Sequence, residues 1–290
     1  MNSRLRKGIF IASLCIFVGS LAFIGYEVLY QPMQNRSEVE SVQKIYHAVE
    51  SKEPAASSSE APEETVQRKR DAFAQLKQGN SDTIGWIQIP NTVVDYPVMQ
   101  SSKDRPEYYL RRGYDQKYTK YGCIFLDARC DPPGEAKNLT LYGHNMTDGQ
   151  MFAAILQYTD LDFYKSAPVI DFDLEGVEGK WKVFSVFKTN TLPEQGEVFA
   201  YTQPDFDTDE AFTAFIDQVK SRSLLSIPVD VDADDQLLTL STCSYEFEEF
   251  RTVVVARRVR EGEETTVDLN RAGYNPSPVY PDCWMKKFGK

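Results

Sequence analysis

Histidine and cysteine are scarce in this chain. Its 290 residues include two histidines, His47 and His144, and five cysteines, with no Cys-x-x-C pair among them. These shortages exclude a histidine-rich metal centre and leave a cysteine-type zinc site without support, so we expect no metal and no cofactor. Basic residues are outnumbered as well, with 32 Lys and Arg against 43 Asp and Glu and a net charge of −11. Because nucleic acid selects for basic surfaces, we expect no nucleic-acid partner.

The first thirty residues contain the one long uncharged run. Residues 1–7 carry three basic residues and no acid, and Gly8–Tyr26 is nineteen residues without a charge. A bilayer core needs about 20 apolar residues. The apolar part of a cleaved signal peptide, the alternative, is usually about 7–15 residues long and ends at a small-x-small site. We therefore predict a single-pass membrane anchor over residues 8–30, with the N-terminus cytoplasmic because basic residues stay inside and the rest of the chain extracellular.

Residues 31–81 are expected to form a helical stalk. Apolar residues recur at helical spacing in 37–51 and again in 65–80, where Val66, Phe73 and Leu76 fall on one face. The Pro/Ser/Ala/Glu-rich segment 53–64 between them is typical of a flexible link. His47 lies in the first helix among Lys, Glu and Gln, and we expect an ordinary exposed residue there.

From residue 82 to 261 the pattern changes to short apolar runs separated by turn residues, which predicts strands. We expect eight of them, at 84–89, 93–98, 121–127, 138–143, 168–174, 180–188, 236–242 and 251–259. Eight short strands suggest a closed barrel or a sandwich, so the fold class is mainly β with helices (α+β). Helices are expected at 149–158 and 207–223, the second beginning with a capping box of Asp207 and Glu210. Residues 262–290 form a polar tail without an assigned role.

Three residues are candidates for catalysis. Cys243 ends the strongly apolar run LLTLSTC, and Arg251 begins the next predicted strand eight residues later. Strands joined by a short loop are neighbours, so the thiol and the guanidinium should lie at the same end of the sheet, where the cation favours the thiolate and can stabilise an oxyanion. His144 also follows a strand, in NLTLYGHN. A cysteine, a histidine and an arginine suit acyl transfer, but from the pattern alone a buried cysteine, a turn histidine and an ion-paired arginine are the preferred interpretation.

The other cysteines and acids carry weaker hypotheses. Cys15 lies in the predicted anchor and Cys123 is expected in the core, and a disulfide among Cys123, Cys130 and Cys283 stays open. The acids at 246, 248 and 249 are expected to form a solvated loop. Asp127 ends a strand and could orient His144, but an ordinary surface acid is the preferred interpretation.

The motifs around these residues resemble those of the sortase family. TLSTC at 239–243 followed by Arg251 is similar to the sortase strand signature, and LYGHNM at 141–146 is similar to the sortase histidine motif. The resemblance covers roughly residues 84–259 and is strongest to class B, which has a long helix between the sixth and seventh strands and two N-terminal helices on the barrel. It implies a closed eight-stranded sortase-type barrel. The usual Asp-Pro-aromatic lid of the pilin-polymerising class is missing, since the only Asp-Pro pair is followed by a second proline.

The resemblance also implies an activity. It suggests a cysteine transpeptidase that cleaves a C-terminal sorting motif of NPxTG type in surface proteins of Gram-positive bacteria, holds the acyl group as a thioester on Cys243, and transfers it to a peptidoglycan amine. His144 would be the general acid and base, and Arg251 the ligand of the oxyanion or substrate carbonyl. Ser241 and Thr242 would contact the peptide. The alternatives are a pilin-polymerising sortase with a lysine acceptor, and a surface protein that binds peptides without catalysis.

Overall fold

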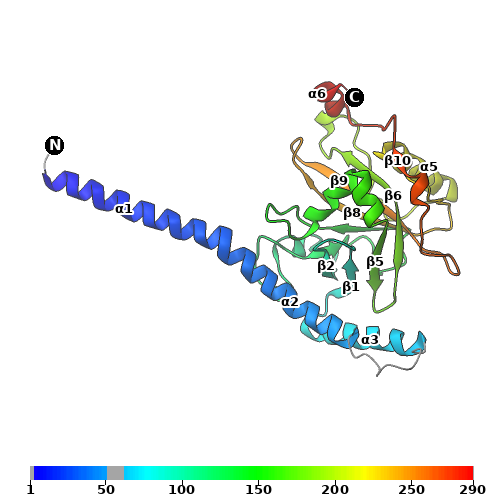
Figure 1. The fold of residues 1–290 in the computed structure, drawn as a ribbon, viewed down its shortest axis with the longest axis horizontal. Coiled ribbons are helices and arrows are strands. Elements are labelled where there is room, and N and C mark those ends of the chain that lie inside the picture. The colour runs from blue at the N-terminus through cyan, green and yellow to red at the C-terminus, as the bar shows by residue number, and fades with distance from the viewer. Residues whose placement is uncertain (1–2, 51–61, 290) are drawn as a thin grey trace. The chain divides into compact units, whose positions relative to one another are not determined.

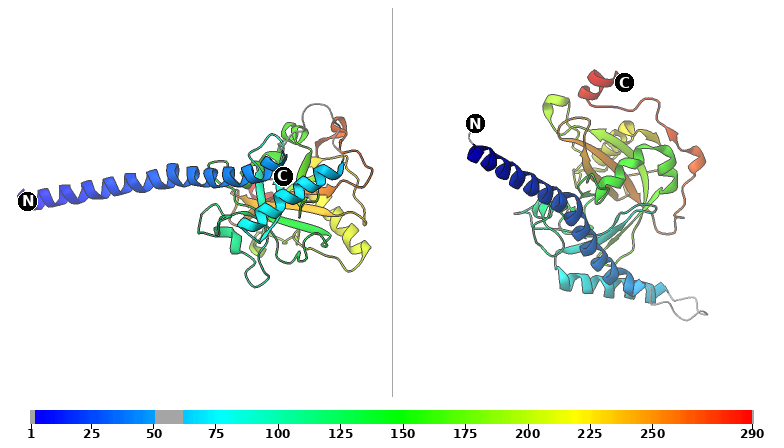
Figure 2. Two further views of the ribbon diagram at one scale, coloured as in Figure 1. Left: turned by 90° about the horizontal axis from the view of Figure 1, so that it is seen from below. Right: turned by 60° about the vertical axis from the view of Figure 1, so that its left-hand side comes forward.

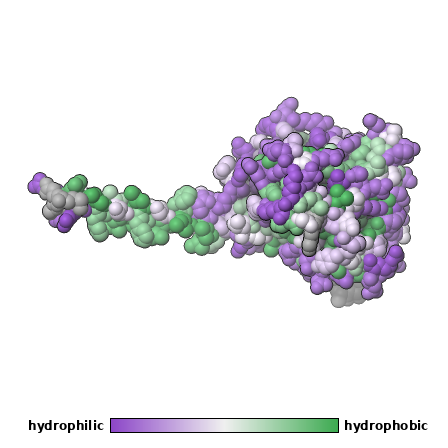
Figure 3. Space-filling model, turned by 90° about the horizontal axis from the view of Figure 1, so that it is seen from above, coloured by the Kyte–Doolittle hydropathy of each residue, from purple (hydrophilic) through white to green (hydrophobic). Residues whose placement is uncertain are grey.

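The computed structural model describes residues 3–50 and 62–289, which form two units divided after Lys44. The N-terminal unit contains α1 (Ser3–Gly25), the π-helical turn η1 (Tyr26–Tyr30) and the start of α2 (Gln31–Glu50). Within it lies a stretch of mean hydropathy 2.3 that is long and apolar enough to cross a membrane, by length and composition. Figure 3 shows the apolar surface of this helix. Most of the predicted flexible link at 53–64 lies outside the described residues.

Two helical segments pack on the barrel in the second unit. Near the end of α2, Tyr46 stacks on Trp86 with ring centroids 4.2 Å apart, and its hydroxyl donates to Asp173 over 2.7 Å. His47 lies 2.9 Å from an Asp95 carboxylate oxygen. The prediction of an ordinary exposed His47 is therefore wrong, because the ring is held against the barrel by a carboxylate 48 residues away.

Helix α3 (Pro62–Gly79) lies beside the first barrel strand (Figures 1 and 2). Phe73 and Leu76 are buried, as the predicted apolar face requires. Val66 is exposed, so the prediction for that position is wrong. Lys69 also contributes, since its ammonium pairs with the nearly buried Asp173 over 2.8 Å. The second helix of the predicted stalk is therefore attached to the barrel by both apolar and charged contacts.

Eight strands close into a barrel in the order β1-β2-β3-β4-β8-β9-β6-β5 (Figure 1). The neighbours β2–β3 and β4–β8 are parallel and all the other neighbouring pairs are antiparallel. The strands are β1 (Thr83–Gln88), β2 (Asp95–Met99), β3 (Ile124–Leu126), β4 (Asn138–Tyr142), β5 (Val169–Leu174), β6 (Lys180–Thr189), β8 (Leu237–Ser244) and β9 (Phe250–Arg258). The predicted eight-stranded α+β barrel is confirmed, with strand ends shifted by at most three residues.

Helix α5 (Asp209–Arg222) lies between β6 and β8 in the chain and covers the outside of the sheet. Its buried residues at helical spacing pack on side chains of β6 and β9: Phe212, Phe215, Ile216 and Val219 against Phe184, Phe187, Val253 and Val255. The predicted capping box is wrong. Thr208 is the N-cap, with its hydroxyl accepting from the Ala211 N–H over 3.2 Å, so Glu210 lies one position too early to complete a box with Thr208.

The remaining elements are short. The predicted helix at 149–158 is a 3₁₀ segment, η3 (Phe152–Thr159), followed by α4 (Leu161–Ser166). The tail has structure of its own: β10 (Gly273–Tyr274) pairs with β7 (Leu225–Ser226), and α6 (Asp282–Phe288) follows. In Figure 1, α6 lies at the end of the barrel unit opposite to α3. The further 3₁₀ turns are η2 (Tyr108–Arg111), η4 (Pro193–Gln195) and η5 (Leu269–Arg271).

Candidate active site

Cys243 and Arg251 face each other across the hairpin of β8 and β9. The two residues are direct partners in the antiparallel register. Opposed residues in such a pair project to the same side of the sheet, with Cβ atoms about 4.5–5.5 Å apart. The loop between the strands therefore fixes the thiol and the guanidinium as neighbours, as the eight-residue spacing predicts.

His144 reaches the same place because β4 lies parallel to β8. Both residues that flank it are bonded to the end of β8: Thr242 Oγ1 donates to the Gly143 carbonyl over 2.7 Å, and Asn145 Nδ2 donates to the Cys243 carbonyl over 3.0 Å. The backbone around the histidine is thus tied to the residues that carry the thiol. A β4 that ended elsewhere would leave the imidazole without this connection.

The His144 ring is oriented by a backbone carbonyl. Nε2 lies 2.8 Å from the Leu110 oxygen, and because a carbonyl only accepts, Nε2 carries the proton and Nδ1 is the nitrogen left to exchange one. Burial lowers the pKa of His144, an effect that the hydrogen bond to Leu110 opposes and the nearby charge of Arg111 reinforces. The imidazole is therefore mainly neutral at pH 7.

Arg251 is charged and held on one side. Burial alone would lower its pKa, but the Glu249 carboxylate, 2.6 Å from the guanidinium, and the neighbouring Cys243 raise it. Arg251 also donates to the Phe250 carbonyl over 3.1 Å. One face of the guanidinium is thus bonded to its own hairpin, and the residue still lines the cavity described next.

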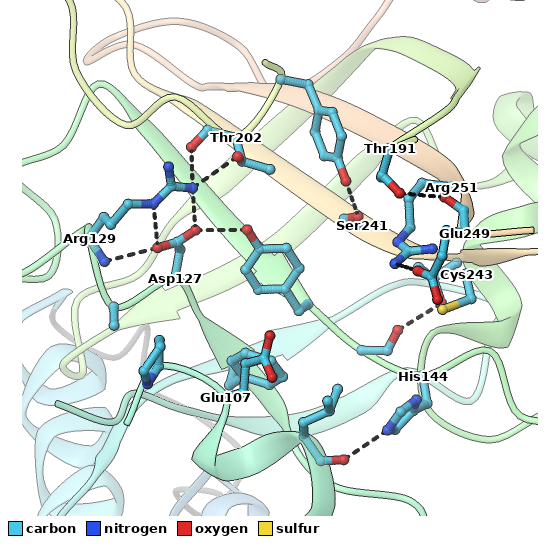
Figure 4. A pocket seen from close by; sticks show the side chains of 18 of the residues that line it. Glu107, Asp127, Arg129, His144, Thr191, Thr202, Ser241, Cys243, Glu249 and Arg251 are labelled. Carbon is cyan, nitrogen blue, oxygen red and sulfur yellow. Dashed lines mark hydrogen bonds and ion pairs between the residues drawn. The ribbon is translucent and has the colours of Figure 1, made fainter. Parts of the chain in front are cut away.

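All three residues line one cavity of about 890 Å³ (Figure 4). Its walls come from β4, β8 and β9, from the 3₁₀ turn η2, and from the loop that follows β6. Lining residues include Glu107, Leu110, Asp127, Arg129, Tyr142, His144, Thr191, Phe199, Thr202, Ser241, Thr242, Cys243, Glu249 and Arg251. A cavity of this size can hold several residues of an extended peptide, with a thiol, an imidazole and a guanidinium at one end.

Comparison with known proteins identifies the family. The model of the Sortase domain matches residues 87–259, which is more than half of the chain. This chain belongs to the sortase family. Its catalytic class follows: it is a cysteine transpeptidase.

The relatives of this sortase are class B enzymes. It is 31% identical to Sortase B of Listeria monocytogenes over 261 residues, or 89% of this chain and 98% of the relative. Sortase B of Staphylococcus aureus is 28% identical over 262 residues, 89% of this chain and 99% of the relative. Among solved structures, a Staphylococcus aureus sortase B–substrate complex has a TM-score of 0.68 at 29% identity, covering 80% of this chain and 99% of that one.

Ser241 and Thr242, predicted to contact peptide, line the cavity of this sortase, but their hydroxyls already have protein partners. Ser241 Oγ lies 2.9 Å from the Tyr201 hydroxyl, and Thr242 donates to Gly143 as described above. Both side chains are buried. These hydrogen bonds indicate that Ser241 and Thr242 help to fix the end of β8.

The prediction that the acids of the β8–β9 loop are solvated is wrong for Glu246, whereas Glu248 and Glu249 are exposed. Glu249 pairs with Arg251, and Glu246 is half-buried between Lys188 and Ser244. Burial would raise the pKa of Glu246, but the hydrogen bonds from Lys188 and Ser244 keep it below its usual value. The sequence did carry a signal for the Glu249–Arg251 pair, because Glu249 lies two residues before Arg251 and is close enough to pair with its guanidinium.

Asp127 lies at the other end of the cavity (Figure 4) and is bonded there to residues other than His144. It accepts two bonds from the Arg129 guanidinium, at 3.0 and 2.6 Å, and one from the Tyr142 hydroxyl at 2.7 Å. Arg129 in turn donates to Thr202. Burial would raise the pKa of Asp127, but these bonds lower it. The expectation of a surface acid is wrong, since Asp127 is buried and charged.

The described residues contain neither a metal-binding cluster nor a disulfide. Within residues 3–50 and 62–289, no group of three or more His, Cys, Asp or Glu is placed to hold a metal ion. All five cysteines belong to these ranges and none is disulfide-bonded. Cys123 is buried, as expected for a core residue.

Proposed function

We propose that this sortase cleaves an NPxTG-type sorting motif with Cys243 as nucleophile, His144 as general acid and base, and Arg251 as ligand of the oxyanion. One observation carries the proposal: the hairpin register and the hydrogen bonds on both sides of His144 bring the three side chains to one end of a cavity large enough for a peptide. Of the five cysteines, all of which the structure describes, Cys243 alone lines that cavity.

The first half-reaction forms a thioester. Neutral His144 takes the Cys243 thiol proton on Nδ1 as the sulfur attacks the carbonyl carbon of the motif's threonine. An electron pair of the C=O bond moves onto the carbonyl oxygen, where the Arg251 guanidinium offsets the charge. As the peptide bond breaks, the His144 imidazolium gives the Nδ1 proton to the leaving amine. The products are an acyl-enzyme, a neutral His144 and a released C-terminal fragment with a free amino group.

The second half-reaction transfers the acyl group to an amine of a peptidoglycan precursor. The incoming amine attacks the thioester, His144 takes a proton from it, and the Cys243 thiolate leaves. A likeness supports an acceptor with a terminal amine: a solved sortase B in complex with triglycine is 30% identical to this chain, with a TM-score of 0.66. The buried Thr242 hydroxyl, which can still accept a hydrogen bond, and Ser241 would border the bound peptide.

The apolar N-terminal helix supports a location at the membrane. In this proposal residues 8–30 cross the bilayer, residues 1–7 stay in the cytoplasm, and the barrel faces the cell wall, where surface proteins with sorting motifs and the acceptor amines are found.

The test is cleavage of a fluorogenic NPxTG-type peptide by the full chain in detergent, with hydroxylamine as the acceptor. Cys243→Ala should abolish both cleavage and the acyl-enzyme adduct seen by intact mass spectrometry. Cys283→Ala, which removes another half-exposed thiol, should keep both. Cleavage that persists in Cys243→Ala would refute the assigned nucleophile. Replacing hydroxylamine with a triglycine or with a lysine side-chain amine separates cell-wall attachment from pilin polymerisation.

A further inference from the structure

The C-terminal helix α6 packs against the loop that joins Cys243 to Arg251. Trp284 of α6 lies nearly parallel to Phe250, at 6.0 Å between centroids and 16° between planes, and 6.3 Å from Phe247. Tyr280 also stacks on Trp284, at 4.9 Å. Phe250 directly precedes Arg251 and is fully buried. We call Phe247, Phe250, Tyr280, Trp284 and Phe288 the C-terminal aromatic cluster.

The same loop is bonded through its backbone to two other segments. The carbonyl of Glu246 accepts from Lys287 of α6 over 3.1 Å. The carbonyls of Glu248 and Glu249 accept from Gln195 and Thr191, over 2.8 and 2.7 Å. Glu249 needs such support because its φ is +50°, a conformation that non-glycine residues rarely adopt. The loop conformation that aims Glu249 at Arg251 is thus fixed by contacts from outside the hairpin.

Helix α6 also meets the loop after β6 at Gly196. The φ of Gly196 is +128°, and a Cβ there would come within 2.9 Å of the Asp282 nitrogen at the start of α6. The backbone of this loop therefore approaches the helix closely, and its neighbours Thr191 and Gln195 are the residues that hold the β8–β9 loop. Helix α6 thus touches both segments beside the Cys243–Arg251 end of the cavity.

Helix α6 itself lies beyond the part of the chain that the family model matches, which ends at residue 259. We propose that α6, through Trp284, positions the β8–β9 loop and thereby Arg251 for acyl transfer. Trp284 is a positioning residue: it lines no part of the cavity and acts through Phe250 and the loop. The inference rests on the proposed role of Arg251.

The test compares Trp284→Ala with Trp284→Phe and Val279→Ala in the full chain. Val279 is a half-exposed tail residue outside the aromatic cluster. Trp284→Ala should lower kcat about tenfold and leave KM within about twofold, because a displaced Arg251 stabilises the transition state less. Trp284→Phe, which keeps a stacked ring, should restore kcat to within about twofold, and Val279→Ala should match the parent. Wild-type kcat in Trp284→Ala would overturn the proposal.

A double-mutant cycle separates positioning from general destabilisation. In an Arg251→Lys background, Trp284→Ala should cost less than about twofold in kcat/KM, because the group it positions is already altered. A full tenfold loss in both backgrounds would show that Trp284 acts elsewhere. Hydrogen exchange gives a readout independent of activity: amides 245–250 should exchange faster in Trp284→Ala while those of β4 and β8 stay protected, and an unchanged loop would contradict the proposal. If Cys243→Ala retains activity, the proposed function fails instead.

Discussion

The hairpin of β8 and β9 carries an arginine at each end, and the two are held in opposite ways. Arg257 is fully buried and makes two hydrogen bonds to Glu263, at 2.6 and 2.7 Å, with Asp235 also 4.0 Å away. Arg251 has one carboxylate partner, Glu249, whose side chain is 55% exposed. The same residue type in the same pair of strands thus forms a closed ion-pair network at one end and an open site at the other.

The difference shows what an arginine needs in order to bind a substrate. A buried guanidinium that is bonded to fixed carboxylates cannot bind a new anion without breaking those bonds. Arg251 lines the cavity and keeps one side outside its own hairpin, so a developing oxyanion can approach it. Arg257 and its partners instead join β9 to the loop before β8 and to Glu263 beyond β9, which serves stability.

Removing Arg251 should cause the largest loss of function. Arg251→Ala should reduce kcat/KM by on the order of 10²–10³, because the oxyanion loses the guanidinium that lies across the hairpin from Cys243. Peptide cleavage kinetics and a thermal melt measure activity and stability side by side, and Tm should stay within about 2 °C. Arg251→Lys is the matched control. Its kcat/KM should lie between those of wild type and Arg251→Ala, since an ammonium keeps the charge but not the fork of donors. Full activity in Arg251→Ala would show that Arg251 does not stabilise the oxyanion.

Removing Arg257 should lower stability and leave activity nearly unchanged. Arg257→Met should lower the free energy of unfolding by on the order of 3 kcal/mol, because Glu263 and the buried Asp235 lose their shared cation. Denaturant unfolding measures this, and the kcat/KM of the folded protein should change less than about twofold. The control is Arg258→Met on the exposed neighbour, where a change of a few tenths of a kcal/mol is expected. Equal effects of the two variants would show that the network adds nothing.

The barrel could be predicted from the sequence because each strand is encoded locally. Apolar runs such as LLTLST, bounded by turn residues, set the strand positions, and the short β8–β9 loop set the pairing of Cys243 with Arg251. The position of His144 could not be predicted from local patterns alone. It requires β4 and β8, about a hundred residues apart, to pair in parallel, and local periodicity does not encode such a pairing. The resemblance to sortase motifs supplied that link.

Several of the errors share one cause, contacts between distant segments. His47 and Glu246 look solvated in their own segments, yet each meets an oppositely charged or polar group far along the chain. Helix α6 was missed because seven residues are too few for periodicity to show, and its half-buried Trp284 packs on aromatic residues of another loop. The cap of α5 failed differently, since Thr208 and Asp207 are both good N-caps and adjacent in the chain.

The smallest effect should come from the acid that closes the Arg257 network. The guanidinium of Arg257 and the ammonium of Lys182 hold the pKa of Glu263 well below its usual range. A depressed pKa contributes stability that is present above the unfolded-state value of about 4.3 and is lost as the pH falls toward the folded value. Glu263→Gln should therefore lower the free energy of unfolding by about 1–2 kcal/mol at pH 7, less for its partial exposure.

The pH dependence distinguishes this from a simple packing defect. The gap between wild type and Glu263→Gln should shrink as the pH is lowered from 5 to 3, because the unfolded wild-type chain takes up a proton at Glu263 in this range while the folded protein does not. Urea unfolding at each pH measures the gap. Glu264→Gln removes a neighbouring charge bonded to Thr266 over 3.3 Å, and should stay within a few tenths of a kcal/mol of wild type at pH 7. A gap that stays constant down to pH 3 would mean that Glu263 stabilises β9 through shape, and the contrast between the two arginines would then rest on burial alone.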